Sequence, residues 1–192
     1  MLEKISDALK EFTFLSPKDL FQLASIAKLK YVSKNEHIVK AGEYNYQAIK
    51  VIKGLLSHYV IDKNGYERTL LFVPEKMNSG SLQTTINRKP SDENIVALED
   101  SLLLTIDIRE LEKLASASIN ILKLLNQNYK QIITEAALRI KFLIVHSPEE
   151  RYVHFCQTYP HLEQRIKQKH LASYLGITVS SLSRIRARIS KQ

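Results

Sequence analysis

The chain has 192 residues, of which 28 are Lys or Arg and 20 are Asp or Glu, so its formal net charge is +8. Its one cysteine, Cys156, is too few for a disulfide framework, a thiolate zinc cage or an iron–sulfur cluster. No apolar run approaches the roughly 18 residues of a membrane span, and acids close to the first residue argue against a signal peptide. We therefore expect a cytoplasmic protein with two domains and no membrane partner.

The positive charge is concentrated near the C-terminal end of the sequence. Residues 1–110 hold fifteen basic and fifteen acidic residues, whereas residues 161–192 hold seven basic residues and one acid, Glu163. A basic tail on a neutral body is typical of proteins that bind a polyanion such as DNA. The alternative, a basic face that serves solubility, predicts charges scattered along the chain.

The first part of the chain predicts helix followed by sheet. Residues 2 to about 30 are expected to be helical, because Ser16 can cap a helix, Pro17 suits its first position, and apolar residues then recur at helical spacing. From Tyr31 the pattern changes to short segments rich in Val, Ile and Leu, which are 37–43, 48–62, 67–73 and 94–107. These segments predict an antiparallel β-roll or sandwich. Asn64–Gly65 lies between two of them and predicts a hairpin with a type I′ turn, in which both central residues have positive φ.

From Asp107 to about His146 the apolar residues follow helical spacing. One stripe steps by three and four with a break near Arg139, as in a heptad seam: Ala115, Ser118, Leu122, Leu125, Tyr129, Ile132, Ala136 and Leu143. A second stripe is expected to pack on the β domain: Ile119, Leu124, Ile133, Ala137, Ile140 and Ile144. The seam predicts a homodimer in which four side chains face the other subunit, namely Leu122, Leu125, Tyr129 and Ile132. The alternative is an amphipathic helix buried within its own chain.

A new helix is predicted after this long one, and with it a domain boundary. Ser147 can serve as its cap, Pro148 as its first residue, and two acids follow in the first turn. We therefore expect an effector-type β domain with N-terminal helices at 1–110, a dimerisation helix at 111–146 and a DNA-binding domain at 147–192.

Residues 168–187 predict a helix-turn-helix. Ala172 is small where two helices would touch, Gly176 can leave the first helix with positive φ, and Thr178 can cap the second. Such hairpins also occur as plain packing units, but the small residues, the cap and the basic charge together favour DNA binding. We expect the DNA contacts to come from Gln168, Lys169, Thr178, Val179, Ser180, Ser183, Arg184, Arg186 and Arg188.

The order of these elements, with five local motifs, resembles the Crp/Fnr family of bacterial transcription regulators. The motifs are AGE at 41–43, IKG at 52–54, the Asn64–Gly65 hairpin, SPEERY at 147–152 and the helix-turn-helix. The resemblance covers nearly the whole chain. It implies an α+β fold: an N-terminal antiparallel β-roll that is cyclic-nucleotide-binding-like, a long dimerisation helix and a C-terminal helix-turn-helix domain that is winged-helix-like.

The resemblance also implies a homodimer that regulates transcription by binding a two-fold symmetric site on double-stranded DNA, with RNA polymerase as a further candidate partner. In the recognition helix, family members often place an arginine and a glutamate, where this sequence has Val179 and Ser180. Arg184 matches the family's second arginine. The operator sequence therefore stays open.

Residues 80–94 resemble the loop that binds the cyclic nucleotide in some family members. Those loops begin with Gly-Glu and end with Arg-Ser, whereas Ser81 replaces the glutamate and Ser91–Asp92 replace the last pair. A carboxylate about 4 Å from a phosphate is repelled by roughly 1 to 4 kcal/mol. Gly80, Ser81, Arg88, Ser91 and Asp92 thus form a degenerate effector loop, and control by cyclic AMP is not expected. The alternative is a cyclic-nucleotide-responsive regulator in which Arg88 or Lys89 binds the phosphate.

No other chemistry is predicted, and the chain is expected to have no metal site, no cofactor and no catalytic residues. His37 and His58 fall on predicted strands, where a lone histidine is more often structural than a haem ligand. Metal-dependent β-roll enzymes need two closely spaced histidines on one strand, and nucleophile or phosphate-loop motifs are absent.

Overall fold

The computed structural model describes residues 13–190, and the chain divides into two compact units. The N-terminal unit holds the residues up to 60 together with 72–130, and the C-terminal unit holds residues 61–71 together with 131–192. The tip of one hairpin, residues 61–71, therefore belongs with the C-terminal helices. Among the helices of the described part, none is long and apolar enough to cross a membrane.

The first described helix, α2 (Pro17–Ile26), begins as predicted. Ser16 caps it, and Asp19 completes a capping box by accepting from the Ser16 backbone N–H at 2.9 Å. The helix ends at Ile26, however, and strand β1 (Ala27–Val32) follows, so the prediction of helix to about residue 30 is wrong. Pairing of β1 with a long apolar strand outweighs the local helical pattern there. The rest of that prediction, residues 2–12, lies outside the described residues.

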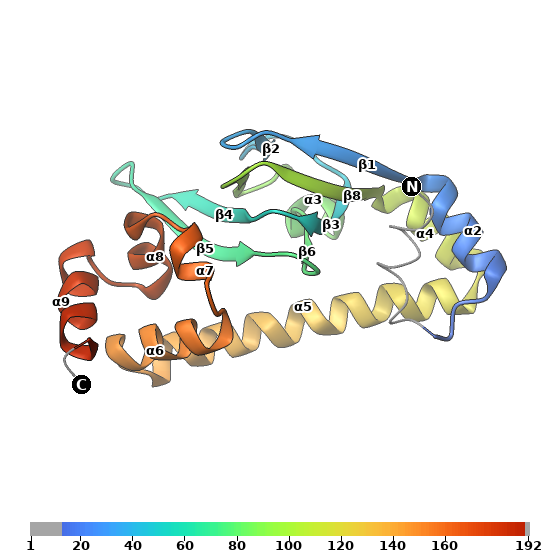
Figure 1. Ribbon diagram of the computed structural model, residues 1–192. Coiled ribbons are helices and arrows are strands. Elements are labelled where there is room, and N and C mark those ends of the chain that lie inside the picture. The colour runs from blue at the N-terminus through green and yellow to red at the C-terminus, as the bar shows by residue number, and fades with distance from the viewer. Residues whose placement is uncertain (1–12, 191–192) are drawn as a thin grey trace. The chain divides into compact units, whose positions relative to one another are not determined.

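The β strands form two four-stranded sheets, with the orders β1-β8-β3-β6 and β2-β7-β4-β5 (Figure 1). The bounds are β2 His37–Val39, β3 Gln47–Lys53, β4 Leu56–Ile61, β5 Glu67–Val73, β6 Asn78–Ser79, β7 Asn94–Ala97 and β8 Ser101–Asp107. The pairs of β8 with β1 and β3, and of β7 with β2 and β4, are antiparallel. The prediction of an antiparallel β domain in an α+β chain is confirmed, and apolar side chains of both sheets, such as Val51, Leu56, Ile95 and Leu103, are fully buried.

The turn between β4 and β5 differs from the predicted type I′ turn. Gly65 has a φ of +81°, but Asn64 is not among the residues with positive φ. The Gly65 N–H donates to the Asp62 carbonyl at 2.9 Å, and the Asp62 N–H donates to the Tyr66 carbonyl at 2.9 Å. This is the longer hairpin loop in which a left-handed glycine follows an ordinary turn. The Asp62 carboxylate stabilises it by accepting from the backbone N–H groups of Asn64 and Tyr66.

Two helices replace the single long one that was predicted, α4 (Ile108–Ala117) and α5 (Ile119–Val145). Ser118 separates them with extended backbone angles, φ −132° and ψ 118°. The Asp19 carboxylate accepts from Ser118 Oγ at 2.5 Å and from Asn120 Nδ2 at 2.9 Å, and so fastens this junction to α2. The contacts to Asp19 come from far away in sequence, so the periodicity of the segment could not reveal the break.

The predicted orientation of α5 is partly wrong within the N-terminal unit, which holds this helix up to residue 130. Leu125 is only 8% exposed and lies in a core cluster with residues of α2 and α4, and Tyr129 packs against the same cluster. Ile132 is half-buried, so of the four predicted dimer residues only Leu122 is exposed. In the second stripe, Leu124 is buried in the same cluster, whereas Ile119 is exposed. The stripe's other members lie in the C-terminal unit, where their side chains are exposed: Ile133, Ala137, Ile140 and Ile144. Two apolar stripes were evident from the sequence, but their spacing does not determine which of them is buried within the chain.

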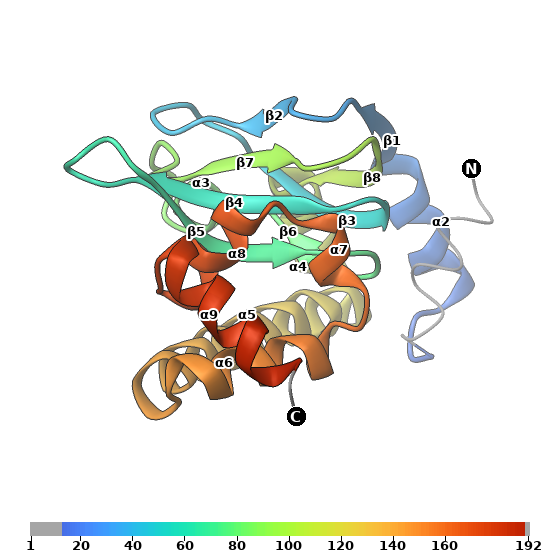
Figure 2. The ribbon, with the colours of Figure 1, turned by 60° about the vertical axis from the view of Figure 1, so that its left-hand side comes forward.

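The C-terminal unit is helical apart from its hairpin segment, and Figure 2 shows α8 and α9 in red tones. Its helices are α6 Pro148–Thr158, α7 Leu162–Arg165, α8 Gln168–Leu175 and α9 Val179–Ile189, together with the last part of α5. Ser147 and Glu150 form the capping box of α6, with Pro148 in the first turn, as the sequence predicted. The described residues end one position after α9, so the winged-helix-like part of the expectation, a β wing beyond that helix, stays a prediction.

Candidate nucleic-acid interface

Helices α8 and α9 form a helix-turn-helix around Gly176. The Ile177 N–H donates to the Ala172 carbonyl, and the Gly176 N–H donates to the Ser173 carbonyl, each at 3.0 Å. This pair of bonds is a Schellman motif, which needs a left-handed residue, and Gly176 has a φ of +68°. A β-carbon there would also lie 3.3 Å from Arg151 Nη1. The positive φ predicted for Gly176 is confirmed.

Buried apolar side chains fix the two helices against each other. Leu171, Ala172, Leu175 and Leu182 are at most 1% exposed. Because this contact uses one face of α9, the opposite face is left for solvent or a partner. The apolar spacing and the small Ala172 were visible in the sequence, so this part of the site could be predicted.

The exposed face of α9 begins at its cap. Thr178 Oγ1 accepts from the Ser181 N–H at 3.1 Å and contacts the Ser180 hydroxyl at 2.9 Å. Beyond the cap, Val179, Ser180, Ser183, Arg184 and Ala187 are all exposed. Arg184 donates a long hydrogen bond of 3.4 Å to the Ser180 carbonyl and forms no ion pair with any other described residue. Its guanidinium is therefore available to donate hydrogen bonds to an anion or to a carbonyl oxygen.

The other two predicted arginines of α9 are already paired with acids. Arg186 Nη2 lies 2.6 Å from Glu163 Oε1, and both side chains are less than one-third exposed. Glu163 also accepts from Tyr152 Oη at 2.8 Å and from Cys156 Sγ at 3.2 Å. Burial, and then the contact with Glu163, raises the pKa of Cys156 to about 11, so its thiol stays protonated at neutral pH. This network ties α9 to α6 and α7.

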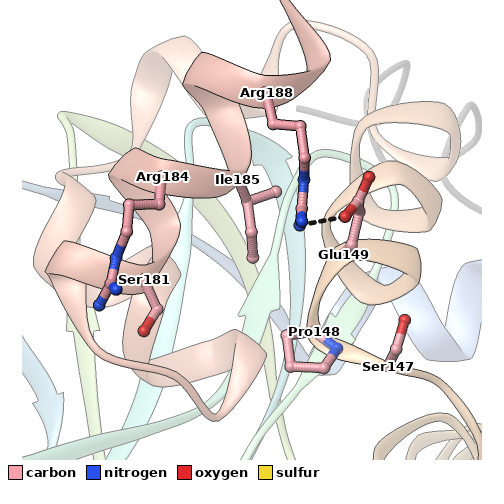
Figure 3. A pocket seen from close by; sticks show the side chains of 7 residues that line it. All are labelled: Ser147, Pro148, Glu149, Ser181, Arg184, Ile185 and Arg188. Carbon is pink, nitrogen blue, oxygen red and sulfur yellow. Dashed lines mark ion pairs between the residues drawn. The ribbon is translucent and has the colours of Figure 1, made fainter.

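Arg188 pairs with Glu149, which lies in the first turn of α6. Figure 3 shows Arg188 reaching Glu149, while Arg184 lies beside Ser181 on the other side. Both arginines line a hollow with a volume of about 480 Å³. Pro148 and Ile185 complete much of the wall. The hollow therefore opens beside the exposed face of α9. The acids Glu149 and Glu163 are the site residues that sequence reasoning missed, because nothing local marks them as partners of arginines more than twenty residues away.

The first turn of α8 carries the remaining predicted residues. Gln168 and Lys169 are exposed, and the cap residue Lys167 makes no side-chain hydrogen bond to the helix. Lys169 Nζ lies 3.6 Å from Glu67 Oε2 of β5, within the same compact unit. Burial, followed by the charge of Lys169, lowers the pKa of His170 and so favours the neutral form of this side chain.

The degenerate effector loop is closed by contacts within its own chain. Gly80 has a φ of +141°, and a β-carbon there would lie 2.8 Å from the Gln47 carbonyl oxygen. Ser81 is fully buried and caps the short helix α3 (Leu82–Thr85). Ser91 is 3% exposed, and its N–H donates to the Glu43 carbonyl at 2.9 Å. Asp92 is exposed and accepts from the Gln83 side chain at 3.2 Å.

Arg88, the alternative phosphate ligand, is occupied elsewhere. Its backbone is left-handed, with a φ of +56°. The guanidinium pairs with Glu112 of α4 and donates to the Thr85 carbonyl at 2.5 Å. A phosphate would have to compete with the Glu112 carboxylate for this side chain.

The two strand histidines each have side-chain partners. His58 is buried, with Nδ1 3.1 Å from Glu93 Oε2 and Nε2 2.8 Å from Ser79 Oγ. His37 Nε2 lies 2.8 Å from Tyr59 Oη. These three contacts agree with the structural role expected for the two histidines. Among residues 13–190 no group of three or more His, Cys, Asp or Glu is arranged to hold a metal ion.

Comparison with solved structures identifies the fold. The chain is similar to FixK2 from Bradyrhizobium japonicum, with a TM-score of 0.74, 17% identity, and 87% of this chain and 86% of that chain covered. It is also similar to the c-di-GMP-responsive global regulator CLP of Xanthomonas campestris, with a TM-score of 0.71, 14% identity and 92% of each chain covered.

A third similar structure is a protein from Eubacterium rectale assigned to the Crp/Fnr family of transcriptional regulators. Its TM-score is 0.72, its identity 16%, and the match covers 96% of this chain and 88% of that chain. No family model and no curated protein matches the sequence. At these identities the likeness establishes the fold, which this chain shares with regulators of the Crp/Fnr type.

Proposed function

We propose that this chain is a sequence-specific DNA-binding transcription regulator of the Crp/Fnr family. The observation that carries the proposal is the exposed polar face of α9, with an unpaired Arg184, on a helix-turn-helix whose turn and cap are fully formed. In this motif the second helix enters the major groove, and its N-terminal side chains reach base edges. The fold shared with Crp/Fnr regulators supports the same function.

The exposed residues divide by the contacts they are suited to make. Val179, Ser180, Ser183 and Arg184 face outward near the start of α9, where base edges would lie. Thr178 and the first turn of α8, with Gln168 and Lys169, are suited to the phosphates on either side. Arg186 and Arg188 are also proposed to lie near DNA, but each must first leave its acid, Glu163 or Glu149, before it can bind a phosphate.

The exposed stripe of α5 supports a homodimer. Ile119, Leu122, Ile133, Ile140 and Ile144 recur in steps that fit a heptad seam and are between 39% and 77% exposed. A dimer through this stripe would present two recognition helices to two half-sites about one helical turn apart. Chromosomal DNA as the target agrees with a cytoplasmic location, and RNA polymerase is the further partner that an activator would contact.

Regulation independent of cyclic AMP is part of the proposal. Arg88 is paired with Glu112, Ser81 is buried as a helix cap, and Asp92 places a carboxylate where a phosphate ligand is needed. A nucleotide shifts a regulator only as far as it binds one conformation better than the other. A loop with these contacts offers a cyclic phosphate little binding energy.

Selection from a random DNA library, followed by fluorescence anisotropy at several salt concentrations, tests the function. We expect enrichment of a two-fold symmetric site, and an affinity that falls steeply with salt because binding releases counterions from phosphates. Arg184→Ala should weaken the selected site and relax base preference, with Arg184→Lys as the control that keeps the charge. Failure to bind either selected or random DNA at low salt would remove the proposal.

A further inference from the structure

The hairpin between β4 and β5 packs against the first helix of the helix-turn-helix. The Thr69 N–H of β5 donates to Ser173 Oγ of α8 at 2.9 Å. The same hydroxyl lies 3.4 Å from the Glu67 carbonyl, to which it can donate. Thr69 is only 5% exposed, and residues 61–71 form one compact unit with the C-terminal helices. Ser173 thus anchors β5 beside α8.

This anchor places the Glu67 carboxylate next to Lys169, a side chain that is proposed to bind DNA. Glu67, two residues before Thr69, lies 3.6 Å from Lys169 Nζ in the first turn of α8. The proposed function assigns Lys169 to a phosphate, so the Glu67 carboxylate occupies the same cationic group that a phosphate would occupy. A carboxylate at that position also repels an approaching phosphate.

The negative charge of Glu67 is not neutralised within the hairpin itself. The neighbouring cation, Arg68, donates to Asp62 Oδ2 at 2.7 Å at the turn. Glu67 therefore acts on α8, where Lys169 is its ion-pair partner. The two side chains of this pair are 46% and 63% exposed, so a polyanion can displace the carboxylate.

We propose that the β4–β5 hairpin is an autoinhibitory clamp on the DNA-binding unit. Glu67 competes with DNA phosphate for Lys169, and the bond from Thr69 to Ser173 holds Glu67 in place. The clamp rests on the proposed function, since its competitor is DNA. While the hairpin stays in place, the clamp lowers the affinity of the chain for DNA. Displacement of the hairpin from α8 raises that affinity.

The central experiment measures DNA affinity of the full chain after Glu67→Gln. We expect affinity for the selected site to rise about two- to fivefold, the range set by an exposed ion pair. Glu36→Gln is the matched control, because Glu36 forms a similarly exposed pair of 3.7 Å with Lys30 in the N-terminal unit. It changes the net charge equally and should leave affinity within twofold of the unchanged protein.

A double-mutant cycle decides whether the effect runs through Lys169. In the Lys169→Gln background, Glu67→Gln should bring no gain, because the contested cation is gone. An equal gain in both backgrounds would mean general electrostatic repulsion and would overturn the clamp, as would an equal gain in the Glu36→Gln control. An unchanged affinity for Glu67→Gln in a protein that binds DNA would also overturn it, and would leave the proposed function standing.

Amide hydrogen exchange tests the anchor without DNA. We expect the Thr69 amide of the full chain to be protected, and Ser173→Ala to make it exchange several-fold faster, because its acceptor is removed. Saturating DNA should also speed its exchange, since the clamp opens. Protection that is unchanged by Ser173→Ala would refute the anchor, whereas a protein with a protected Thr69 that binds no DNA would refute the proposed function.

Discussion

Arg186 and Glu163 form an ion pair of 2.6 Å, whereas Arg184, two positions earlier on the same helix, has no acidic partner among the described residues. Two positions on a helix correspond to about 200°, so the two side chains leave α9 in nearly opposite directions. One points to α6 and α7, and the other points to solvent. The basic residues of this helix therefore differ in role although they are alike in sequence.

Alanine substitutions should separate these roles. Arg186→Ala should lower the free energy of unfolding by about 1 to 3 kcal/mol, because Glu163 loses its cation while it stays among partly buried groups. Arg184→Ala should change stability by less than about 0.5 kcal/mol, as expected for an exposed residue. Chemical denaturation measures both changes in stability. In fluorescence anisotropy with DNA, Arg184→Ala should cause the larger loss of affinity and Arg186→Ala the smaller one. A larger stability loss for Arg184→Ala would contradict the assignment.

The dimer seam proposed on the exposed stripe of α5 gives a second prediction. Ile140→Lys should produce a folded monomer, because Ile140 is 60% exposed in the chain and, in the proposed dimer, would pack only against the other subunit. Leu125→Lys should instead unfold the N-terminal unit, since Leu125 is 8% exposed within the core and an unpaired charge there costs several kcal/mol. Light scattering with circular dichroism distinguishes the two results. A monomeric wild-type protein at micromolar concentration would rule the dimer out.

Cyclic nucleotides provide the third prediction. Cyclic AMP and cyclic GMP should raise neither the melting temperature nor the affinity for DNA, because a ligand that does not bind the folded state cannot stabilise it. Glu112→Gln is the informative variant, since it releases Arg88 from its acid. If calorimetry showed micromolar binding of a cyclic nucleotide, and Glu112→Gln strengthened it, Arg88 would be the residue that binds the phosphate and the prediction would be wrong.

The fourth prediction concerns acid stability. Asp19 is 4% exposed, and hydrogen bonds from Ser118, then Ser16 and Asn120, lower its pKa well below the ordinary value of 3.8. The folded state therefore favours the carboxylate, and the stability that it contributes is present above about pH 4 and is lost as the pH falls toward the lower folded pKa. Asp19→Asn should flatten the fall in stability below pH 4 and cost about 2 kcal/mol at pH 7. If the free energy of unfolding fell equally below pH 4 in Asp19→Asn and in the unchanged protein, this role of Asp19 would be contradicted.

The local signals in the sequence were sufficient for much of the fold. Ser16, Ser147 and Thr178 cap their helices as predicted, and Gly176 has the predicted left-handed backbone. These features could be predicted because a cap or a turn involves residues within about four positions of one another. The β segments between 37 and 107 were found for the same reason, since alternation and turn residues are local.

Local signals of this kind cannot reveal which residues contact one another when they are distant in the sequence. The sequence by itself determined two apolar stripes on α5, a helix-turn-helix and a basic C-terminal region. Only the tertiary structure decided that Leu125 faces inward, that Ser118 interrupts the long helix for Asp19, and that Glu67 meets Lys169. The physical reason is that burial and ion pairing depend on which surfaces meet in space, and a periodic pattern fixes a side chain's face on its own helix but not what that face contacts.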